Sequence, residues 1–104
     1  MAETEACGQG GPLERALHVI GDRWSLLALH EIGRGAARFN DIQRRTGMPR
    51  DRLAQRLRRL ETWSVIGRRC YCEHPPRYEY TLTEAGRSLL PMLAAIERWG
   101  GRYT

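Results

Sequence analysis

The stretch PRDRLAQRLRRLETW, residues 49–63, repeats leucine and arginine at spacings that suit an α-helix. Leu53, Leu57 and Leu60 lie four and three residues apart. They therefore fall on one face of a helix, which has roughly 3.6 residues per turn. The stretch predicts a helix that packs through leucine and presents guanidinium groups to solvent.

The same region holds most of the positive charge of the chain. All seventeen residues counted as lysine or arginine are arginine. Eleven of them lie between Arg34 and Arg69 with only three acidic residues, which gives this block a formal charge of +8. The rest of the chain has six arginines and nine acidic residues, a formal charge of −3. Such a block favours a polyanionic partner, nucleic acid before anionic membrane.

Upstream of this stretch, apolar residues recur at helical spacing. They predict a first helix at residues 12–20, a second at 23–32 and a third, short helix at 39–46. Pro49 is expected to open the arginine-rich helix, which should end near Trp63. Because a short turn with Gly47 joins the third helix to the arginine-rich one, the pair has the arrangement of a helix-turn-helix.

Downstream, β-branched and aromatic residues predict two strands, at residues 66–72 and 77–82. The four residues between them, Glu73-His74-Pro75-Pro76, are expected to form the loop of a β-hairpin. One last helix should follow over residues 84–99, with Thr83 as its N-cap and a kink at Pro91. The fold predicted is mainly α with a small β-hairpin.

Size and composition limit the domain count and the class of protein. A chain of 104 residues is long enough for one domain with one core. We expect a flexible arm at residues 1–11 and a single domain at 12–104. No apolar run approaches the roughly 20 residues of a membrane span, and the first residues lack a signal peptide. With an odd number of cysteines as well, the sequence predicts a cytoplasmic protein without a membrane partner.

Catalytic and metal-binding patterns are missing from the sequence. No serine stands in a nucleophile motif, and no glycine-rich loop follows a predicted strand. Cys70 and Cys72 share one face of a predicted strand, but no Cys-x-x-Cys or His-x-x-x-His spacing supplies further ligands. We therefore expect no enzyme activity, no bound metal and no cofactor.

Four segments, taken in order, resemble the HxlR-type winged-helix regulators. They are the opening segment (12–17 with 20–27), RFNDI (38–42), the arginine-rich helix (53 and 55–61) and PPRYEYTLTEAG (75–86). The resemblance covers about residues 12 to 103. It implies a winged helix-turn-helix fold and a bacterial transcriptional regulator that binds double-stranded operator DNA as a homodimer.

The resemblance identifies the arginine-rich helix as the recognition helix, whose N-terminal end enters the major groove first. Arginine can bind guanine, glutamine can bind adenine, and aspartate can accept from cytosine. We therefore expect four residues to read bases: Arg50, Asp51, Gln55 and Arg56. Seven others are expected to contact the DNA backbone or to belong to the wing: Arg38, Arg44, Arg45, Arg52, Arg59, His74 and Arg77.

The first and last helices usually build the dimer in this family. The residues expected at that interface are apolar: Leu13, Leu17, Leu89, Met92, Leu93, Ile96 and Trp99. The operator would then be pseudo-palindromic, with half-site centres about 34 Å apart.

Two alternatives stay open at this point. The fold could serve as a protein-interaction module without specific DNA binding, although the +8 block argues against it. Cys7 is either an accessible redox thiol or an incidental cysteine. The sensing cysteine of the family stands next to the first-helix proline, a position that is Gly11 here. The sequence also leaves room for a small-molecule or redox effector as a partner.

Overall fold

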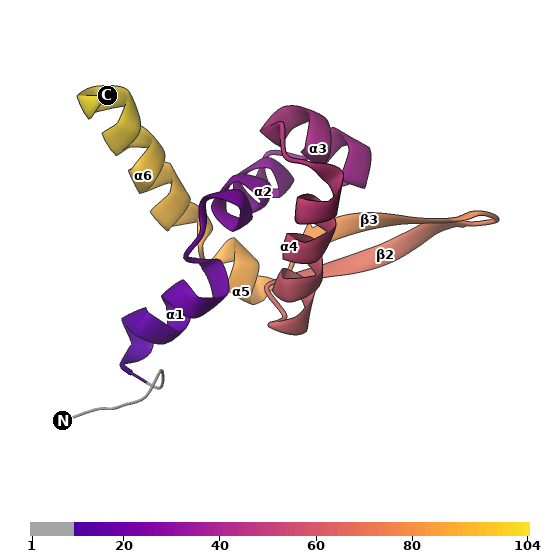
Figure 1. The fold of residues 1–104 in the computed structure, drawn as a ribbon, viewed down its shortest axis with the longest axis horizontal. Helices are drawn as coiled ribbons and strands as arrows, with labels where there is room; N and C mark the ends of the chain where they lie inside the picture. Colours follow the sequence, from indigo (N-terminus) through magenta and orange to yellow (C-terminus); the bar gives the residue numbers. More distant parts are fainter. Residues whose placement is uncertain (1–9) are drawn as a thin grey trace.

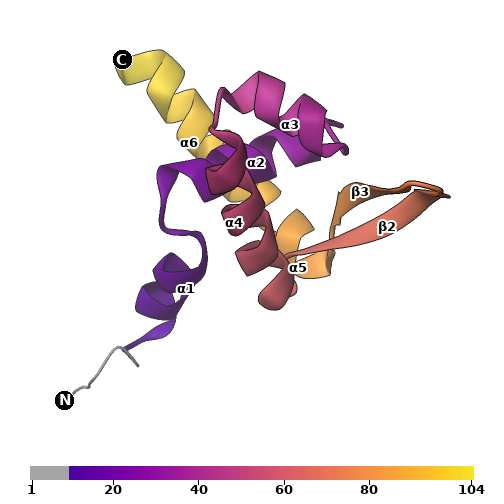
Figure 2. The same ribbon diagram turned by 45° about the vertical axis from the view of Figure 1, so that its right-hand side comes forward.

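The computed structural model describes residues 10–104. Four helices come first: α1 (Pro12–Ile20), α2 (Arg23–Gly33), α3 (Phe39–Thr46) and α4 (Arg50–Thr62). Strands β2 (Ile66–Glu73) and β3 (Pro76–Leu82) form an antiparallel hairpin, called the wing below, and helices α5 (Glu84–Arg87) and α6 (Leu90–Tyr103) end the chain. Figures 1 and 2 show α2, α3 and α4 gathered into a body, with the wing on one side and α1 and α6 on the other.

The body is held together by the predicted leucine face of α4. Leu53 and Leu60 are fully buried and Leu57 is almost so. They share one core with residues of α2 and α3, among them Leu29 and Ile42. The helix begins at Arg50, one residue later than expected, because Pro49 adopts the extended backbone of an N-cap.

The turn between α3 and α4 depends on one glycine. Gly47 follows α3 with a φ of 72°, in the left-handed region that residues with a Cβ rarely adopt. Its N–H donates to the carbonyl of Gln43 at 2.8 Å, which closes α3 and lets α4 leave in a new direction. The predicted helix-turn-helix is confirmed.

The wing is longer than the sequence suggested. Glu73 pairs with Pro76, so the predicted four-residue loop shrinks to His74-Pro75. Proline has no N–H, so it fits the first position of an edge strand, where no hydrogen bond to the partner strand is required. The base of the wing is attached to the segment before α3. There the Tyr80 N–H donates to the Ala37 carbonyl at 2.6 Å, and the backbones of Arg38 and Glu79 form an isolated antiparallel β-bridge.

The prediction of a single kinked helix over residues 84–99 is wrong. The chain forms two helices, α5 and α6, which are separated at Ser88 and Leu89. Pro91 lies in the first turn of α6, where its missing N–H has no helical partner to lose, so it begins a helix instead of bending one. Thr83 is the N-cap as predicted, and its hydroxyl accepts from the Gly86 N–H at 3.2 Å.

Within residues 10–104, the structure contains no helix long and apolar enough to cross a membrane.

Candidate nucleic-acid interface

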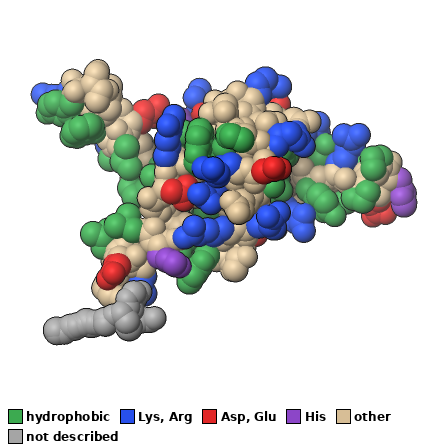
Figure 3. All heavy atoms as spheres, viewed as in Figure 1, with side chains coloured by type: hydrophobic (Ala, Val, Ile, Leu, Met, Phe, Trp, Pro, Cys, Tyr) green, Lys and Arg blue, Asp and Glu red, His purple; other side chains and the backbone are tan. Residues whose placement is uncertain are grey.

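The outer face of α4 carries polar side chains over a shallow hollow. The hollow is lined by Asp51, Arg52, Ala54, Gln55 and Arg58. All except Ala54 are exposed, and neither Arg52 nor Arg58 forms an ion pair within residues 10–104. Figure 3 shows basic side chains gathered over the part of the surface where α4 lies in Figure 1. This face combines free positive charge with groups that can donate and accept hydrogen bonds.

Arg50 stands at the entrance to this face. Its guanidinium donates to the side-chain oxygens of Asn40 at 3.1 Å and Gln43 at 3.2 Å. It also lies over the ring of Phe39, 4.8 Å from the centroid. These contacts from α3 fix an exposed guanidinium at the N-terminal end of α4 without neutralising its charge.

Arg56 lies on a different side of α4. Its Nε is 3.1 Å from Oδ1 of Asp22, and the side chain is only 21% exposed. The structure therefore brings Arg50, Asp51 and Gln55 to the open surface but directs Arg56 toward the start of α2. Arg59 also faces inward, since its guanidinium donates to the backbone carbonyl of His18 in α1.

Asp22, to which the sequence assigned no role, is the partner of Arg56. As the N-cap of α2 it accepts from the Ser25 N–H at 2.9 Å and from the Ser25 hydroxyl at 2.8 Å. Partial burial alone would raise the pKa of its carboxyl. The two hydrogen bonds from Ser25 and the Arg56 guanidinium outweigh this, and they hold the pKa below its ordinary value.

A sequence signal for Arg56 exists. Counting i, i+3, i+4 and i+7 from Leu53 gives Arg56, Leu57 and Leu60, so Arg56 belongs to the stripe that faces the core. An arginine on that stripe needs an acceptor close to the core. Asp22 supplies it 34 residues earlier in the chain, a separation that no local pattern reveals.

Between the wing and α3 the surface forms a cleft. Three arginines and two tyrosines contribute to its lining: Arg38, Arg50, Arg77, Tyr71 and Tyr78. The Arg38 guanidinium lies over the Tyr71 ring at 4.3 Å from the centroid. Arg77 is exposed and forms no ion pair within the described part of the chain. His74 is exposed at the tip of the wing.

One carboxylate of the wing reduces the charge of this cleft. Glu79 lies 2.7 Å from the guanidinium of Arg69 and 3.6 Å from that of Arg38. The hydrogen bond from Arg69 is the main reason why the pKa of Glu79 lies below its ordinary value, and the charges of Arg69 and Arg38 add to it. Glu79 therefore offsets part of the formal charge of Arg38.

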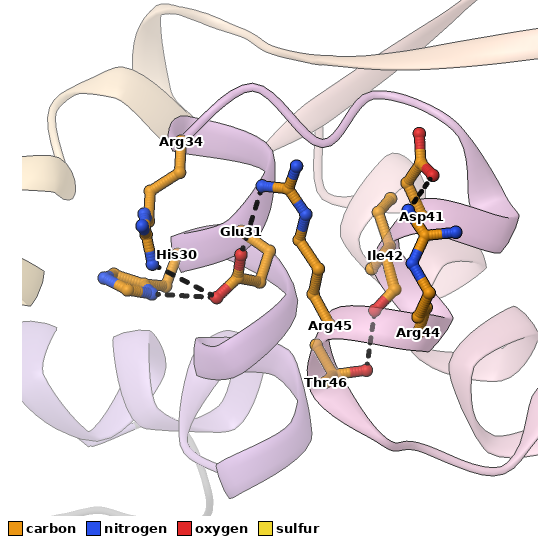
Figure 4. Close-up of polar contacts among 8 residues, drawn as sticks. All are labelled: His30, Glu31, Arg34, Asp41, Ile42, Arg44, Arg45 and Thr46. Carbon is orange, nitrogen blue, oxygen red and sulfur yellow. Dashed lines mark hydrogen bonds and ion pairs between the residues drawn. The ribbon is translucent and has the colours of Figure 1, made fainter.

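The arginines of α3 are also paired, as Figure 4 shows. Arg44 lies 2.7 Å from Asp41 in its own helix. Arg45 reaches across to Glu31 of α2 at 3.8 Å, and Glu31 also has His30 and Arg34 as neighbours at 3.4 and 4.0 Å. Both arginines of α3 remain exposed, so phosphate can still approach them.

The sequence profile of the HxlR-like helix-turn-helix matches residues 19–104. The chain belongs to the HxlR-like helix-turn-helix family. A helix-turn-helix transcriptional regulator of Mycobacterium tuberculosis, described as uncharacterised, is 41% identical over 95 residues, which cover 91% of this chain and 60% of that protein. YdeP of Bacillus subtilis is 38% identical, with 91% of this chain and 75% of YdeP covered. This chain thus spans about three fifths of its mycobacterial relative.

Solved structures confirm the winged helix-turn-helix. The redox regulator HypR in its oxidised form superposes with a TM-score of 0.82 and 34% identity, covering 90% of this chain and 98% of HypR. A reduced form of YodB from B. subtilis superposes with a TM-score of 0.74 and 30% identity, covering 91% of this chain and 95% of YodB. The winged-helix fold predicted from the four sequence segments is therefore the fold of this HxlR-like chain.

The residues predicted to form a dimer of this HxlR-like chain differ in exposure. Leu93 is buried against the body, and Leu89 is half-buried. The other five are exposed, from 37% to 72%: Leu13, Leu17, Met92, Ile96 and Trp99. Tyr103, at 63% exposure, extends the exposed apolar side of α6. Two helices thus carry large apolar side chains that the described chain leaves uncovered.

Two of the three cysteines of this HxlR-like chain lie among the described residues. Cys7 lies outside the described residues. Cys70 is exposed and Cys72 half-buried in the wing, and both are free. Within residues 10–104, no three histidine, cysteine or acidic side chains are grouped to hold a metal ion.

Proposed function

We propose that this chain regulates transcription by binding double-stranded operator DNA through α4 and the wing. The observation that carries the proposal is the outer face of α4, where Arg52 and Arg58 are exposed and have no carboxylate partner within residues 10–104. Asp51 and Gln55 beside them can discriminate base edges in the major groove. The buried leucines behind this face hold it rigid.

Base reading is assigned to Arg50, Asp51 and Gln55. Arg50 is held in place by Asn40 and Gln43 and keeps its full charge, as a guanine-binding arginine requires. Arg56 was expected in the same set, but it would have to leave Asp22 to reach a base.

Backbone contacts are assigned to residues around that centre. Arg52 and Arg58 flank the base-reading face, and Arg77 and His74 lie on the wing, which would lie along the neighbouring groove. Arg38, Arg44 and Arg45 are exposed but paired with carboxylates, so we expect each to contribute less than an unpaired arginine. Arg59 is engaged with the His18 carbonyl and is left out of the contact set.

The acting species is proposed to be a homodimer on a pseudo-palindromic operator. The support is the exposure of apolar residues on α1 and α6, where Leu13 is 72% and Trp99 60% exposed. Exposed apolar patches of this kind usually mark an interface. A second copy of the chain would cover them and would place two α4 helices on one side of the DNA.

The test is selection of binding sites from a random duplex pool, followed by titration at several salt concentrations. We expect a two-fold symmetric consensus and affinity that falls steeply with salt. Arg52→Ala should weaken binding to all sequences, while Arg98→Ala, which removes the same charge from α6, should not. Binding that is absent or insensitive to salt would favour a protein-interaction module. Repeating the selection with and without oxidant tests a redox effector.

A further inference from the structure

We infer that Arg56 is a positioning residue, which sets the placement of α4 through its ion pair with Asp22 and does not itself contact DNA. The inference rests on the proposed function and changes the role of one residue on the recognition helix. It also adds Asp22, in the turn between α1 and α2, to the residues on which DNA binding depends.

The geometry of the pair is specific. Oδ1 of Asp22 accepts both the Ser25 N–H at 2.9 Å and the Arg56 Nε–H at 3.1 Å, while Oδ2 accepts the Ser25 hydroxyl at 2.8 Å. Ser25 has no exposed surface. The carboxylate is thus held by the start of α2 from one side and by the middle of α4 from the other. The two hydrogen bonds from Ser25 hold the carboxylate in the orientation in which it meets the guanidinium.

The pair acts at the right place to control α4. Arg56 lies beside Leu57, midway along the helix, so a contact there limits rotation of α4 about its axis. Even a small rotation would shift the hollow lined by Asp51, Arg52 and Gln55 relative to a bound groove. The buried leucines prevent a large rotation, because it would expose Leu53, Leu57 and Leu60. They set the exact angle less strictly, because apolar contacts are not directional. A charge-assisted hydrogen bond is directional.

A second contact joins the same parts of the chain. The Arg59 guanidinium donates to the carbonyl of His18 near the end of α1, and the His18 ring meets Trp63 edge-on at 6.2 Å between centroids. One turn along α4, these contacts bind it to α1, just as Arg56 binds it to α2. The recognition helix is therefore attached to the α1–α2 turn at two successive points. The placement of α4 thus depends on α1, and α1 carries the exposed Leu13 and Leu17 that a second copy would contact.

The first variants separate positioning from base reading. Asp22→Ser keeps a good N-cap for α2 but is too short to reach the guanidinium. Arg56→Met keeps the apolar stem and removes the charge. Arg58→Met, two residues further along on the exposed face, is the matched control for loss of one arginine. Each variant and the Asp22→Ser/Arg56→Met double variant is titrated with the selected operator and with random duplex.

We expect the two single variants to weaken operator binding by similar factors, roughly tenfold, as for residues in direct contact. The double variant should be no weaker than the weaker single one. The salt dependence should stay that of the wild type in all three, whereas Arg58→Met should reduce its slope by about one. Arg56→Lys, which keeps a positive charge opposite Asp22, should retain most of the affinity.

Two results would overturn the inference. In one, Arg56→Met loses discrimination at a single base pair while Asp22→Ser binds normally, which would make Arg56 a base reader. In the other, both single variants bind as the wild type does. If the wild type itself selects no sequence, the proposed function fails, and amide chemical shifts of α4 then decide about the pair. Matching shifts along α4 in the two single variants support it, and shifts confined to the mutated residues refute it.

Discussion

Helices α4 and α1 both carry leucines at helical spacing, but they bury them to opposite extents. Leu53 and Leu57 of α4 are 0% and 1% exposed, whereas Leu13 and Leu17 of α1 are 72% and 54% exposed. α6 resembles α1, with Trp99 at 60%. An apolar stripe therefore predicts that a helix has a partner but does not say where that partner is. For α4 the partner lies within the chain, and for α1 and α6 we propose a second copy.

The arginines of α4 divide in the same way. Arg56 has its partner, Asp22, within the chain, and Arg52 has none among residues 10–104. A residue whose partner lies within the chain should affect the stability of the fold or the placement of a helix. A residue without such a partner should affect binding to a second copy or to DNA. The following predictions test this division, from the largest expected effect to the smallest.

Truncation of the α4 core should have the largest effect on folding. Leu57→Ala removes fully enclosed methyl groups and should lower the free energy of unfolding by about 2–5 kcal/mol. Leu13→Ala, the matched change on an exposed stripe, should alter it by less than about 0.5 kcal/mol. Urea titration at a protein concentration that gives monomer is the measurement. Equal costs for the two variants would contradict the division.

Truncation on α6 should instead affect association. Trp99→Ala removes a large exposed side chain that a second copy would cover, and it should weaken self-association by about 2 kcal/mol or more. Sedimentation equilibrium gives the monomer–dimer constant, and circular dichroism checks that the helices persist. Arg98→Ala, the neighbouring position, serves as the control. A dimer as strong as that of the wild type would remove α6 from the interface.

Loss of an unpaired arginine should affect DNA binding alone. Arg52→Ala should cost about 1 kcal/mol of affinity at moderate salt, reduce the salt slope by about one and leave the unfolding curve in place. Arg44→Ala, whose guanidinium is already paired with Asp41, should change the slope less. Fluorescence anisotropy with labelled duplex measures both. The idea fails if Arg44→Ala produces the larger change in slope.

The smallest effect is on pH dependence. The pKa of Asp22 is lowered in the folded chain, so its contribution to stability is present above the ordinary aspartate pKa of about 3.9 and is lost as the pH falls through the lowered value. The stability difference between the wild type and Asp22→Ser should thus be constant near neutral pH and shrink below about pH 4. Chemical denaturation across this range measures it, and a difference that stays constant would show that Asp22 stabilises without its charge.

Local patterns predicted most of the fold, because each relied on near neighbours. Leu53, Leu57 and Leu60 identified the buried face of α4, and Thr83 identified a helix start. The errors came from competing local roles. Pro91 suits either a kink or a first turn, and only the break at Ser88 and Leu89 decides between them.

The site was harder to predict than the fold, because it depends on pairs that are distant in sequence. Periodicity placed Gln55 on the outer face, and Arg50 and Asp51 were expected to read bases because they lie at the N-terminal end of the helix. Arg56 was assigned to the same set although its spacing from Leu53 puts it on the core-facing stripe, and its partner Asp22 stands 34 residues earlier in the chain. The net charge of a segment can be read from its sequence, but the fraction of its arginines that remains unpaired depends on the folded chain.

That fraction has a consequence for how the protein finds its target. Seven of the eleven arginines between Arg34 and Arg69 have a carboxylate within 4.0 Å. Each carboxylate would compete with DNA phosphate for the arginine beside it, which lowers the affinity for DNA of random sequence. A regulator that lets go of random DNA quickly spends less time on wrong sites. If the chain binds operator DNA as proposed, the five carboxylates that pair with these arginines, only two of them within the block, would thus shorten each stop at a wrong site.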